Sequence, residues 1–313
     1  MSLLPETKAV AELATSEPLV SIGVPVRNGA EFLNEAMQLL VDQTYRNIEI
    51  IVSDNASDDG STEIIQQFAV ADPRIKVYRQ PCALTAAENF RFVFQKSSAE
   101  YFMWAACDDR RSLDYVEKLL ECMKRNPQAS LVFGKVAFVS DATNWQGANP
   151  ISYSFETRAD DNPQKSLVRG APGHNTLHFY GLIRSAALRT YPWVWGDLDL
   201  GEDFSILVHL AWMGDCVRAE GGFFYSYLPP VRKAYEDMAM ANNFRPLKRF
   251  PEVRMSWACA QTAHHAGKLT GRSISLTRAF AIMFWSRRLR WARNIVLMIS
   301  PAFVTKIYRK WFY

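Results

Sequence analysis

The segment Tyr101-Phe-Met-Trp-Ala-Ala-Cys-Asp-Asp-Arg110 carries an apolar and aromatic run that stops at two adjacent carboxylates, Asp108 and Asp109. Such a run is typical of a buried strand. Two like charges side by side repel each other, so a partner has to stabilise them. A divalent cation with oxygen ligands, often shared with a phosphate, is a common partner. The alternative is a solvated loop in which one aspartate caps the next helix, and the pair alone does not separate the two interpretations.

Two earlier segments repeat this pattern of a strand that ends at polar residues. Residues 19–33 contain an apolar strand that runs into Pro25 and a turn at Asn28-Gly29, followed by apolar residues at helical spacing. In the second segment, a strand over 48–52 ends at Asp54, and a turn rich in Asp, Ser and Gly leads into a helix. Open α/β sheets bind ligands at the carboxyl ends of their strands, so these polar groups are candidates for a ligand site.

The rest of the chain continues the alternation of strands and helices as far as about residue 227. Ser112 is expected to cap a helix over 113–125, and residues 177–184 are expected to form a strand. The order of elements favours a mainly parallel central sheet with helices on both faces. Further helices are expected over 63–70, 86–96, 185–190 and from 202, and further strands over 74–79, 129–139 and 217–227.

Three motifs together resemble the GT-A nucleotide-sugar-binding domain of family 2 glycosyltransferases. They are Val24-Pro-Val-Arg-Asn-Gly29, Val52-Ser-Asp-Asn-Ala-Ser-Asp-Asp-Gly-Ser61 and Cys107-Asp-Asp109, and they occur in the family's order, each at a strand end. The resemblance covers residues 19–235, which we take as the catalytic domain. It implies a GT-A α/β fold and an inverting, metal-dependent transfer of one sugar from a nucleoside diphosphate to an acceptor hydroxyl.

The resemblance also assigns donor-binding residues. Asp109 would hold Mg²⁺ or Mn²⁺ bridging the diphosphate, and Asp108 would face the ribose or the donor sugar, although spacing alone does not separate the two roles. Asp54 would accept a hydrogen bond from the uracil ring, which favours UDP over GDP and dTDP without excluding them. Pro25, Val26 and Asn28 are expected to line the base and the ribose.

The acidic pair Glu202-Asp203 resembles the family's pair at the start of a helix beneath the acceptor. Asp203 would abstract the acceptor proton, and Glu202 would support it or touch the acceptor. Acids in a first helical turn can also merely complement the helix dipole. Asp197 and Asp199 are a competing choice of base.

Other functions fit the sequence less well. A nucleotidyltransferase would want a Gly- and Lys-rich loop after the first strand, and a dinucleotide-dependent oxidoreductase would want Gly-x-Gly-x-x-Gly there. Processive polymer synthases of family 2 carry the signature Gln-x-x-Arg-Trp. Residues 287–291 of this chain contain Arg-Trp but lack the Gln at the required position, which favours transfer of a single sugar over processive synthesis. A non-catalytic nucleotide-sugar or glycan-binding relative is a third alternative, and the retained carboxylates argue against it.

The amino-acid composition limits the classes of protein and the cellular compartments that fit this chain. The 313 residues are 49% hydrophobic, ample for a sizeable core, and the net charge of +4 is too mild for a nucleic-acid binder. The five cysteines include no Cys-x-x-Cys pair, which indicates reduced thiols rather than disulfides or zinc. Residues 1–18, the expected N-terminal tail, lack a signal peptide's apolar core, and no stretch is long enough to span a membrane. We therefore expect a cytoplasmic protein.

Residues 236–313 form an expected C-terminal extension of basic, aromatic-rich helices. Apolar residues recur at three- and four-residue steps over 281–299, with arginines between them. Such a helix can lie on an anionic membrane surface, or it can pack on the catalytic domain with a charged outer face. A lipid-linked or other glycan acceptor is the expected partner besides the nucleotide-sugar donor, and the oligomeric state is left open.

Overall fold

The computed structural model describes residues 17–139, 145, 174–193, 202–227, 251–271 and 274–281. In chain order the elements are β1 (Val20–Val26), α2 (Ala30–Val41), β2 (Ile48–Asp54), α3 (Ser61–Ala71), β3 (Ile75–Arg79), α4 (Ala86–Gln95), β4 (Tyr101–Trp104), β5 (Arg110–Arg111), α5 (Tyr115–Arg125), β6 (Ala129–Val139), the 3₁₀ helix η1 (His174–Tyr180), β7 (Leu182–Arg184), α7 (Ser185–Arg189), α8 (Glu202–Met213), β8 (Asp215–Tyr227) and α10 (Pro251–Thr270).

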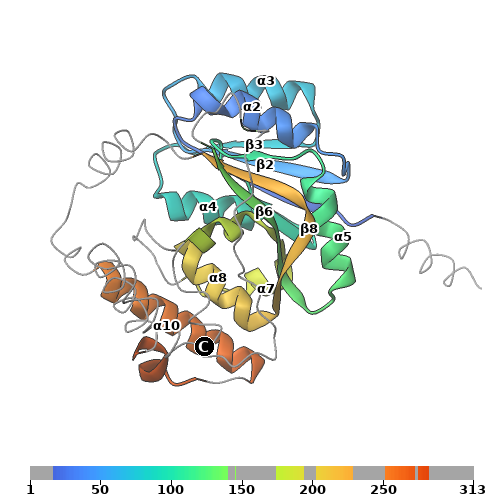
Figure 1. The fold of residues 1–313 in the computed structure, drawn as a ribbon. Helices are drawn as coiled ribbons and strands as arrows, with labels where there is room; N and C mark the ends of the chain where they lie inside the picture. The colour runs from blue at the N-terminus through green and yellow to red at the C-terminus, as the bar shows by residue number, and fades with distance from the viewer. Residues whose placement is uncertain are drawn as a thin grey trace, which may run out of the picture.

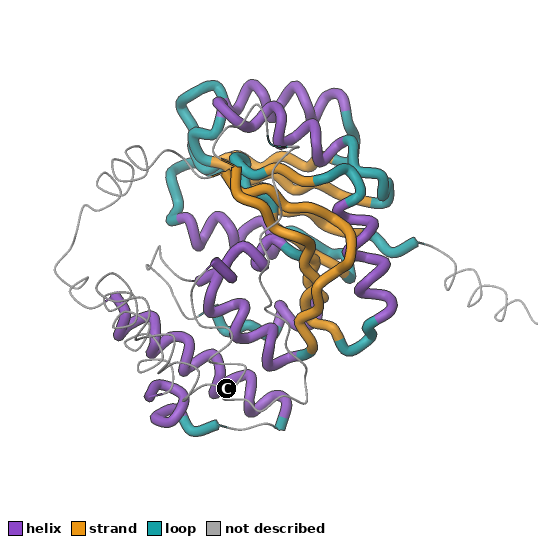
Figure 2. Tube along the Cα trace, viewed as in Figure 1, coloured by secondary structure: helices purple, strands orange, loops and turns teal. Residues whose placement is uncertain are grey.

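The strands form one eight-stranded sheet in the order β3-β2-β1-β4-β7-β6-β8-β5. The pairs β1–β2, β1–β4, β2–β3 and β6–β8 are parallel, whereas β7 runs antiparallel between β4 and β6, and β5 runs antiparallel to β8. Figures 1 and 2 show the strands as one curled layer with helices on both sides. The expected mainly parallel sheet with flanking helices is therefore confirmed.

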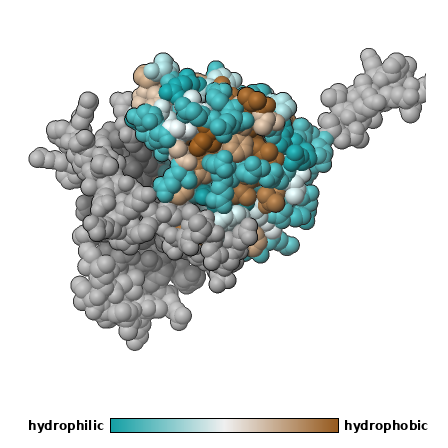
Figure 3. Space-filling view, turned by 90° about the horizontal axis from the view of Figure 1, so that it is seen from above, coloured by the Kyte–Doolittle hydropathy of each residue, from teal (hydrophilic) through white to brown (hydrophobic). Residues whose placement is uncertain are grey.

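Each face of the sheet is covered by its own hydrophobic core. In β4, Tyr101 and Met103 join the core under α2, α3 and α5, whereas Phe102 and Trp104 join the core under α4, α7, α8 and α10. Alternate side chains of a strand point to opposite faces, so a strand covered on both sides has to be apolar throughout. This requirement explains the continuous apolar runs in the sequence. On the α2–α3 side, hydrophilic residues make up most of the described outer surface (Figure 3).

Helix α10, which belongs to the expected C-terminal extension, packs against α8. Its small residues Cys259, Ala260 and Ala263 are buried in the same core as the α8 side chains, and Thr262 Oγ1 lies 2.7 Å from Ser205 Oγ. This part of the extension therefore packs on the catalytic domain. The expected domain boundary at residue 235 and residues 282–313 lie outside the described residues. Among the described helices, none is both long and apolar enough to cross a membrane.

Two local expectations were wrong. Ser112 does not cap a helix that starts at residue 113, because α5 begins at Tyr115 after Asp114, and Ser112 Oγ instead accepts the Phe223 backbone N–H at 2.9 Å. The strand expected over 177–184 is shorter, since residues up to Tyr180 form the 3₁₀ helix η1 and only Leu182–Arg184 pair with the sheet. In both places a tertiary contact overrides a local pattern.

Candidate active site

The carboxyl ends of β1, β2 and β4 meet at one edge of the sheet. β1 lies between β2 and β4 and runs parallel to both, with Val26 opposite Asp54. The loops that follow these strands therefore open on the same side. This arrangement brings Asn28, Asp54 and the acid pair Asp108–Asp109 into three neighbouring loops.

Side chains of the loop after β2 hold the loop after β1. The backbone N–H groups of residues 28, 29 and 30 donate to Ser57 Oγ, Ser61 Oγ and Asp59 Oδ2 at 3.0, 2.9 and 2.9 Å. Helix α2 begins here with Gly29 as its N-cap, which has no side chain to offer, so the second loop supplies the missing acceptors. The Ser- and Asp-rich turn is therefore more than the entry to helix α3.

Asn28 takes part in this contact. Its φ of 51° lies in the left-handed region, which asparagine tolerates better than most residues, and its Oδ1 accepts the Asp58 backbone N–H at 3.1 Å. The third loop touches the same place, because a Cβ built on Gly29 would lie 2.7 Å from Cys107 Sγ.

Asp54 is buried, with 1% of its surface exposed, and is held by three hydrogen bonds. It accepts from the Ser57 backbone N–H at 2.9 Å, from Thr62 Oγ1 at 2.6 Å and from Arg79 Nη1 at 2.6 Å. Burial raises the pKa of Asp54, but these hydrogen bonds and the charge of Arg79 outweigh burial, so the pKa lies below its ordinary value.

Arg79 is a residue of this site that the sequence analysis missed. It lies opposite Asp54 in the β2–β3 pairing, and its half-exposed side chain borders a pocket of about 350 Å³ beside Asp54. The pocket is lined by Ser57, Asp58, Gly60, Thr62, Glu63 and Arg79. The sequence could have indicated Arg79 through its position, because it is the last residue of β3, the strand that pairs with β2.

The acid pair consists of a buried and a partly exposed carboxylate, Asp109 and Asp108. Asp109 is 4% exposed, and burial raises the pKa of Asp108, opposed by a backbone hydrogen bond and by the charges of Arg110 and Arg111. Burial and the two neighbouring acids also raise the pKa of the Cys107 thiol to about 12, so this cysteine is a protonated, unreactive neighbour. Two adjacent carboxylates, one of them buried, favour a bound cation.

Tyr180 joins the acid pair to the acidic start of α8. The pKa of its hydroxyl is raised well above the ordinary value by burial and by the nearby charges of Asp109, Asp108 and Asp203. The ring stacks on Phe224, with 5.2 Å between the ring centroids, which fixes its position. The charges of Asp203 and of the acid pair, which belong to two separate elements, therefore both act on Tyr180. The sequence analysis missed Tyr180 because it treated this segment as an ordinary strand.

Glu202 is the first residue of the same helix. Burial and the charge of Asp203 raise its pKa to about 7, although Arg91 opposes this rise. Arg91 also lies over the Trp193 ring, 5.4 Å from the ring centroid, and Trp193 has a positive φ of 48°. Backbone strain of this kind is often found at functional sites. The competing base candidates Asp197 and Asp199 lie outside the described residues.

The raised pKa of Glu202 predicts a pH-dependent stability. The folded chain keeps this proton up to about pH 7, whereas the unfolded chain releases it near the ordinary value of 4.5. The folded state therefore binds more protons in that window, and wild-type stability falls as the pH rises through it. Glu202→Gln removes the effect, so the variant should gain about 1–2 kcal/mol relative to wild type between pH 4.5 and pH 8, after allowance for partial exposure. Denaturant melts at both pH values measure the difference, and a pH-independent difference would contradict the burial of this carboxylate.

His178 has a structural role. It is 2% exposed, and its ring meets the edge of Phe133 with 4.0 Å between the centroids. The side chain of His174 lies outside the described residues. His178 is therefore part of the core beside Phe133.

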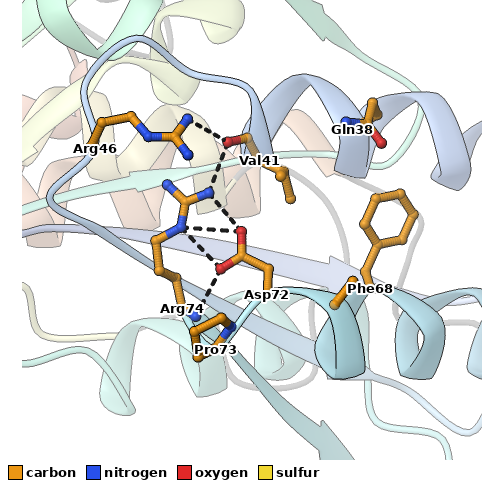
Figure 4. A pocket seen from close by; sticks show the side chains of 8 residues that line it. Gln38, Val41, Arg46, Phe68, Asp72, Pro73 and Arg74 are labelled. Atoms are coloured by element: carbon orange, nitrogen blue, oxygen red, sulfur yellow. Dashed lines mark hydrogen bonds and ion pairs between the residues drawn. The ribbon is translucent and has the colours of Figure 1, made fainter.

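A larger pocket of about 540 Å³ lies at the opposite edge of the sheet, where α2 and α3 end and β3 begins. Arg46 and Arg74 both donate to the Val41 carbonyl there, at 3.1 and 2.8 Å, and Arg74 also binds Asp72 (Figure 4). Cations that bind the last carbonyls of a helix stabilise its end. These arginines therefore terminate α2, and the pocket is separate from the strand-end site.

The carboxylates of Asp108 and Asp109 suit a divalent cation that is also bound by the phosphates of a substrate. Within the described part of the chain, no group of three or more His, Cys, Asp or Glu side chains forms a metal cage. Mg²⁺ is usually bound by one or two carboxylates together with substrate phosphates and water, and carboxylate oxygens suit Mn²⁺ equally. The pair Asp108–Asp109 supplies that number of protein ligands.

Solved structures with the same fold are glycosyltransferases. S. aureus TarS 1-349 in complex with UDP-GlcNAc matches with a TM-score of 0.54 at 13% identity, covering 80% of this chain and 73% of that one. The mannosyltransferase PcManGT from Pyrobaculum calidifontis, in complex with GDP-Man and Mn²⁺, matches with a TM-score of 0.51 at 15% identity, covering 95% and 88%. The expected GT-A fold is thereby confirmed.

The sequence comparison shows to which family the chain belongs. The model of glycosyl transferase family 2 matches residues 21–189, more than half of the chain, so the chain belongs to this family. An uncharacterized glycosyltransferase of Haemophilus influenzae is 33% identical over 121 residues, which are 39% of this chain and 48% of that protein. The putative teichuronic acid biosynthesis glycosyltransferase TuaG of Bacillus subtilis is 28% identical over 127 residues, 41% of this chain and 50% of that protein. The match thus spans about half the length of these relatives.

Proposed function

We propose that this chain is an inverting, metal-dependent glycosyltransferase that moves one sugar from a nucleoside diphosphate to an acceptor hydroxyl. The observation that carries the proposal is the position of Asp54 and the acid pair at the carboxyl ends of neighbouring strands, with the charge of Asp203 near enough to raise the pKa of Tyr180 together with those of Asp108 and Asp109. Asp108 and Asp109 suit the binding of a cation that the diphosphate also binds. Asp203 suits the removal of a proton from the acceptor hydroxyl. A transfer reaction needs both within one region.

The donor half of the site lies in the three strand-end loops. Asp54 and the pocket beside Arg79 would receive the base, with Pro25, Val26 and Asn28 along the base and ribose. Asp108 would face the ribose or the sugar, and Asp109 would hold Mg²⁺ or Mn²⁺. The cation, when bound, would offset the charge that develops on the leaving diphosphate.

Asp203 would act as the general base. The acceptor oxygen forms a bond to the anomeric carbon, and its proton passes to the Asp203 carboxylate. The bond from that carbon to the phosphate oxygen breaks, and its electron pair leaves with the nucleoside diphosphate. Attack from the face opposite the leaving group inverts the anomeric centre. Glu202, with its raised pKa, would support the base or contact the acceptor.

The relatives favour UDP as the first donor to test and a cell-surface glycan as the product. TarS has been solved with UDP-GlcNAc, PcManGT with GDP-Man and Mn²⁺, and TuaG is named for teichuronic acid biosynthesis. We propose a glycan or lipid-linked acceptor on this basis. Contact of residues 275–313 with an anionic membrane surface at the inner face of the cell membrane is a proposal from the sequence alone, because most of this segment lies outside the described residues.

Calorimetry with UDP, GDP and dTDP, each with and without Mn²⁺, tests the proposal. We expect UDP to bind most tightly and Mn²⁺ to strengthen its binding by about tenfold or more. A panel of UDP-sugars should then show slow hydrolysis to UDP. Absence of nucleotide binding under all conditions would contradict the donor site. Binding without hydrolysis or transfer would favour the non-catalytic relative, and pyrophosphate release from UTP would favour a nucleotidyltransferase.

A further inference from the structure

Asn55 ties the loop after β2 to the loops on either side of it. Its backbone N–H donates to the Val26 carbonyl at the end of β1, at 2.8 Å. Its side-chain amide pairs with both backbone groups of Leu84, because Nδ2 donates to the Leu84 carbonyl at 3.0 Å and Oδ1 accepts the Leu84 N–H at 2.7 Å. Asn55 is 2% exposed, so water competes little for these bonds. The amide therefore pairs with Leu84 as the backbone of a neighbouring strand would.

The loop that Asn55 holds covers residues 80–85 and joins β3 to α4. Its first residue is held as well, since the Gln80 N–H donates to the Asp54 carbonyl at 2.8 Å and Gln80 Nε2 donates to Ser53 Oγ at 2.9 Å. Ser53 Oγ in turn donates to Asn89 Oδ1 of α4 at 2.6 Å. Networks of buried hydrogen bonds make a region rigid. The loop is thus anchored near both of its ends to the strand that carries Asp54.

The position of this loop matters for the candidate base site. Arg79, which binds the Asp54 carboxylate, is the last residue of β3 and directly precedes the loop. Pro81, Cys82 and Ala83, between the two anchored ends, are exposed. Since β3 is parallel to β2, the loop opens at the same edge of the sheet as Asp54. An exposed loop with fixed ends at this place limits the size of the base that Asp54 and Arg79 can receive.

The turn that follows Asn55 is strained. Ala56 has a φ of 54°, in the left-handed region that a residue with a Cβ adopts only at a cost in energy. Such a conformation persists where the surrounding contacts impose it. Here they lie on both sides, because Asn55 holds Leu84, and Ser57 Oγ accepts the Asn28 backbone N–H at 3.0 Å. The loop after β2 is therefore fixed relative to both of its neighbours.

We propose that Asn55 is a positioning residue for base selectivity, whose side-chain amide holds residues 80–85 and the preceding Arg79 in place beside Asp54. The inference rests on the proposed function, because it takes Asp54 and Arg79 as the residues that receive the base. A purine is larger than a pyrimidine, so a site bounded by a fixed loop excludes it better than a site whose boundary can move. Loss of the Asn55 amide should therefore weaken UDP binding more than GDP binding. A merely structural role would lower stability and weaken the binding of both nucleotides equally.

The test compares the affinities for UDP and GDP, both with Mn²⁺, by calorimetry in wild type, Asn55→Ala and Asn55→Asp. We expect wild type to prefer UDP, and Asn55→Ala, which loses both bonds to Leu84, to lower this preference by about tenfold. Asn55→Asp still accepts the Leu84 N–H but cannot donate to the carbonyl, so it should lower the preference by about threefold. Its added charge acts on both nucleotides alike and leaves their ratio unchanged. If Asn55→Ala does not fold, the lowered preference of Asn55→Asp is the decisive result.

Gln43→Ala is the matched control. Gln43 is also buried, and its side-chain amide also joins two segments, since Nε2 donates to the Ser112 carbonyl at 2.9 Å and Oε1 accepts the Val116 N–H at 3.0 Å. These contacts lie around the start of α5, which carries no residue assigned to the base, so the preference should stay within about twofold of wild type. Equal weakening of UDP and GDP binding in both Asn55 variants would overturn the positioning role. A wild-type protein that binds neither nucleotide, or both equally, would instead overturn the proposed base site.

Discussion

Replacing Asp203 with asparagine should lower kcat by about 10²- to 10⁴-fold and leave the affinity for UDP within about threefold of wild type. Asparagine keeps the shape of the side chain but cannot take a proton from the acceptor hydroxyl. The charge of Asp203, like the charges of Asp108 and Asp109, raises the pKa of Tyr180, so the three carboxylates lie near the same residue. Its removal should therefore affect the chemical step and spare the nucleotide site, which other strand ends provide. Initial rates of UDP release from the best donor, with and without acceptor, measure kcat, and calorimetry measures the affinity.

The competing explanation for Asp203 is its place in the first turn of α8, where an acid complements the helix dipole. That role is worth about 0.3–1 kcal/mol of stability and has no effect on kcat. Glu117→Gln is the matched control, since Glu117 occupies the first turn of α5 on another part of the sheet. Both variants should lose similar, small amounts of stability in denaturant melts, and only Asp203→Asn should lose turnover. Equal turnover in the two variants would remove Asp203 from the mechanism.

The sequence predicted the strand-end loops because their signals are local. Strands β1, β2 and β4 are continuous apolar runs that stop at polar residues, and each stop marks the ligand edge of a parallel sheet. Asp54, Asp108 and Asp109 are therefore visible as candidates from their positions alone. The start of α8 at Glu202 follows from helical spacing and was expected for the same reason.

The supporting residues could not be found in this way, because their roles depend on contacts between distant segments. Arg79 meets Asp54 only through the pairing of β2 with β3, and Tyr180 meets the acid pair only after η1 has packed against Phe224. The apolar and aromatic residues at 177–180 favoured a strand, and nothing in a local pattern shows that they form a 3₁₀ helix. The burial of Arg111, which is 1% exposed, is likewise invisible in the sequence, since a buried arginine is exceptional.

Asp109→Asn should remove the dependence of UDP binding on Mn²⁺ and, with it, nearly all transferase activity. The amide has the shape of the carboxylate but no negative charge, and hard divalent cations such as Mg²⁺ and Mn²⁺ bind carboxylate oxygens. The described residues offer no cluster of three ligands that could compensate. Without the cation, the charge on the leaving diphosphate is no longer offset, so kcat should fall by about 10³-fold or more. Titration of Mn²⁺ into the UDP complex, followed by calorimetry, measures the lost affinity directly.

Asp108→Asn is the control that separates the two neighbouring carboxylates. If Asp108 faces the ribose or the donor sugar, its asparagine variant should weaken UDP-sugar binding by a similar factor with and without Mn²⁺, so that the contribution of the cation persists. The reverse pattern would exchange the two roles, with Asp108 as the metal ligand and Asp109 facing the ribose or the donor sugar. Burial should make the difference between the two variants large. Asp109 is 4% exposed, and burial raises the pKa of Asp108. A charge removed from either position therefore acts on a group that water screens poorly. If neither variant changed the response to Mn²⁺, the acid pair would be a structural feature of the loop, and the cation would have to be held elsewhere.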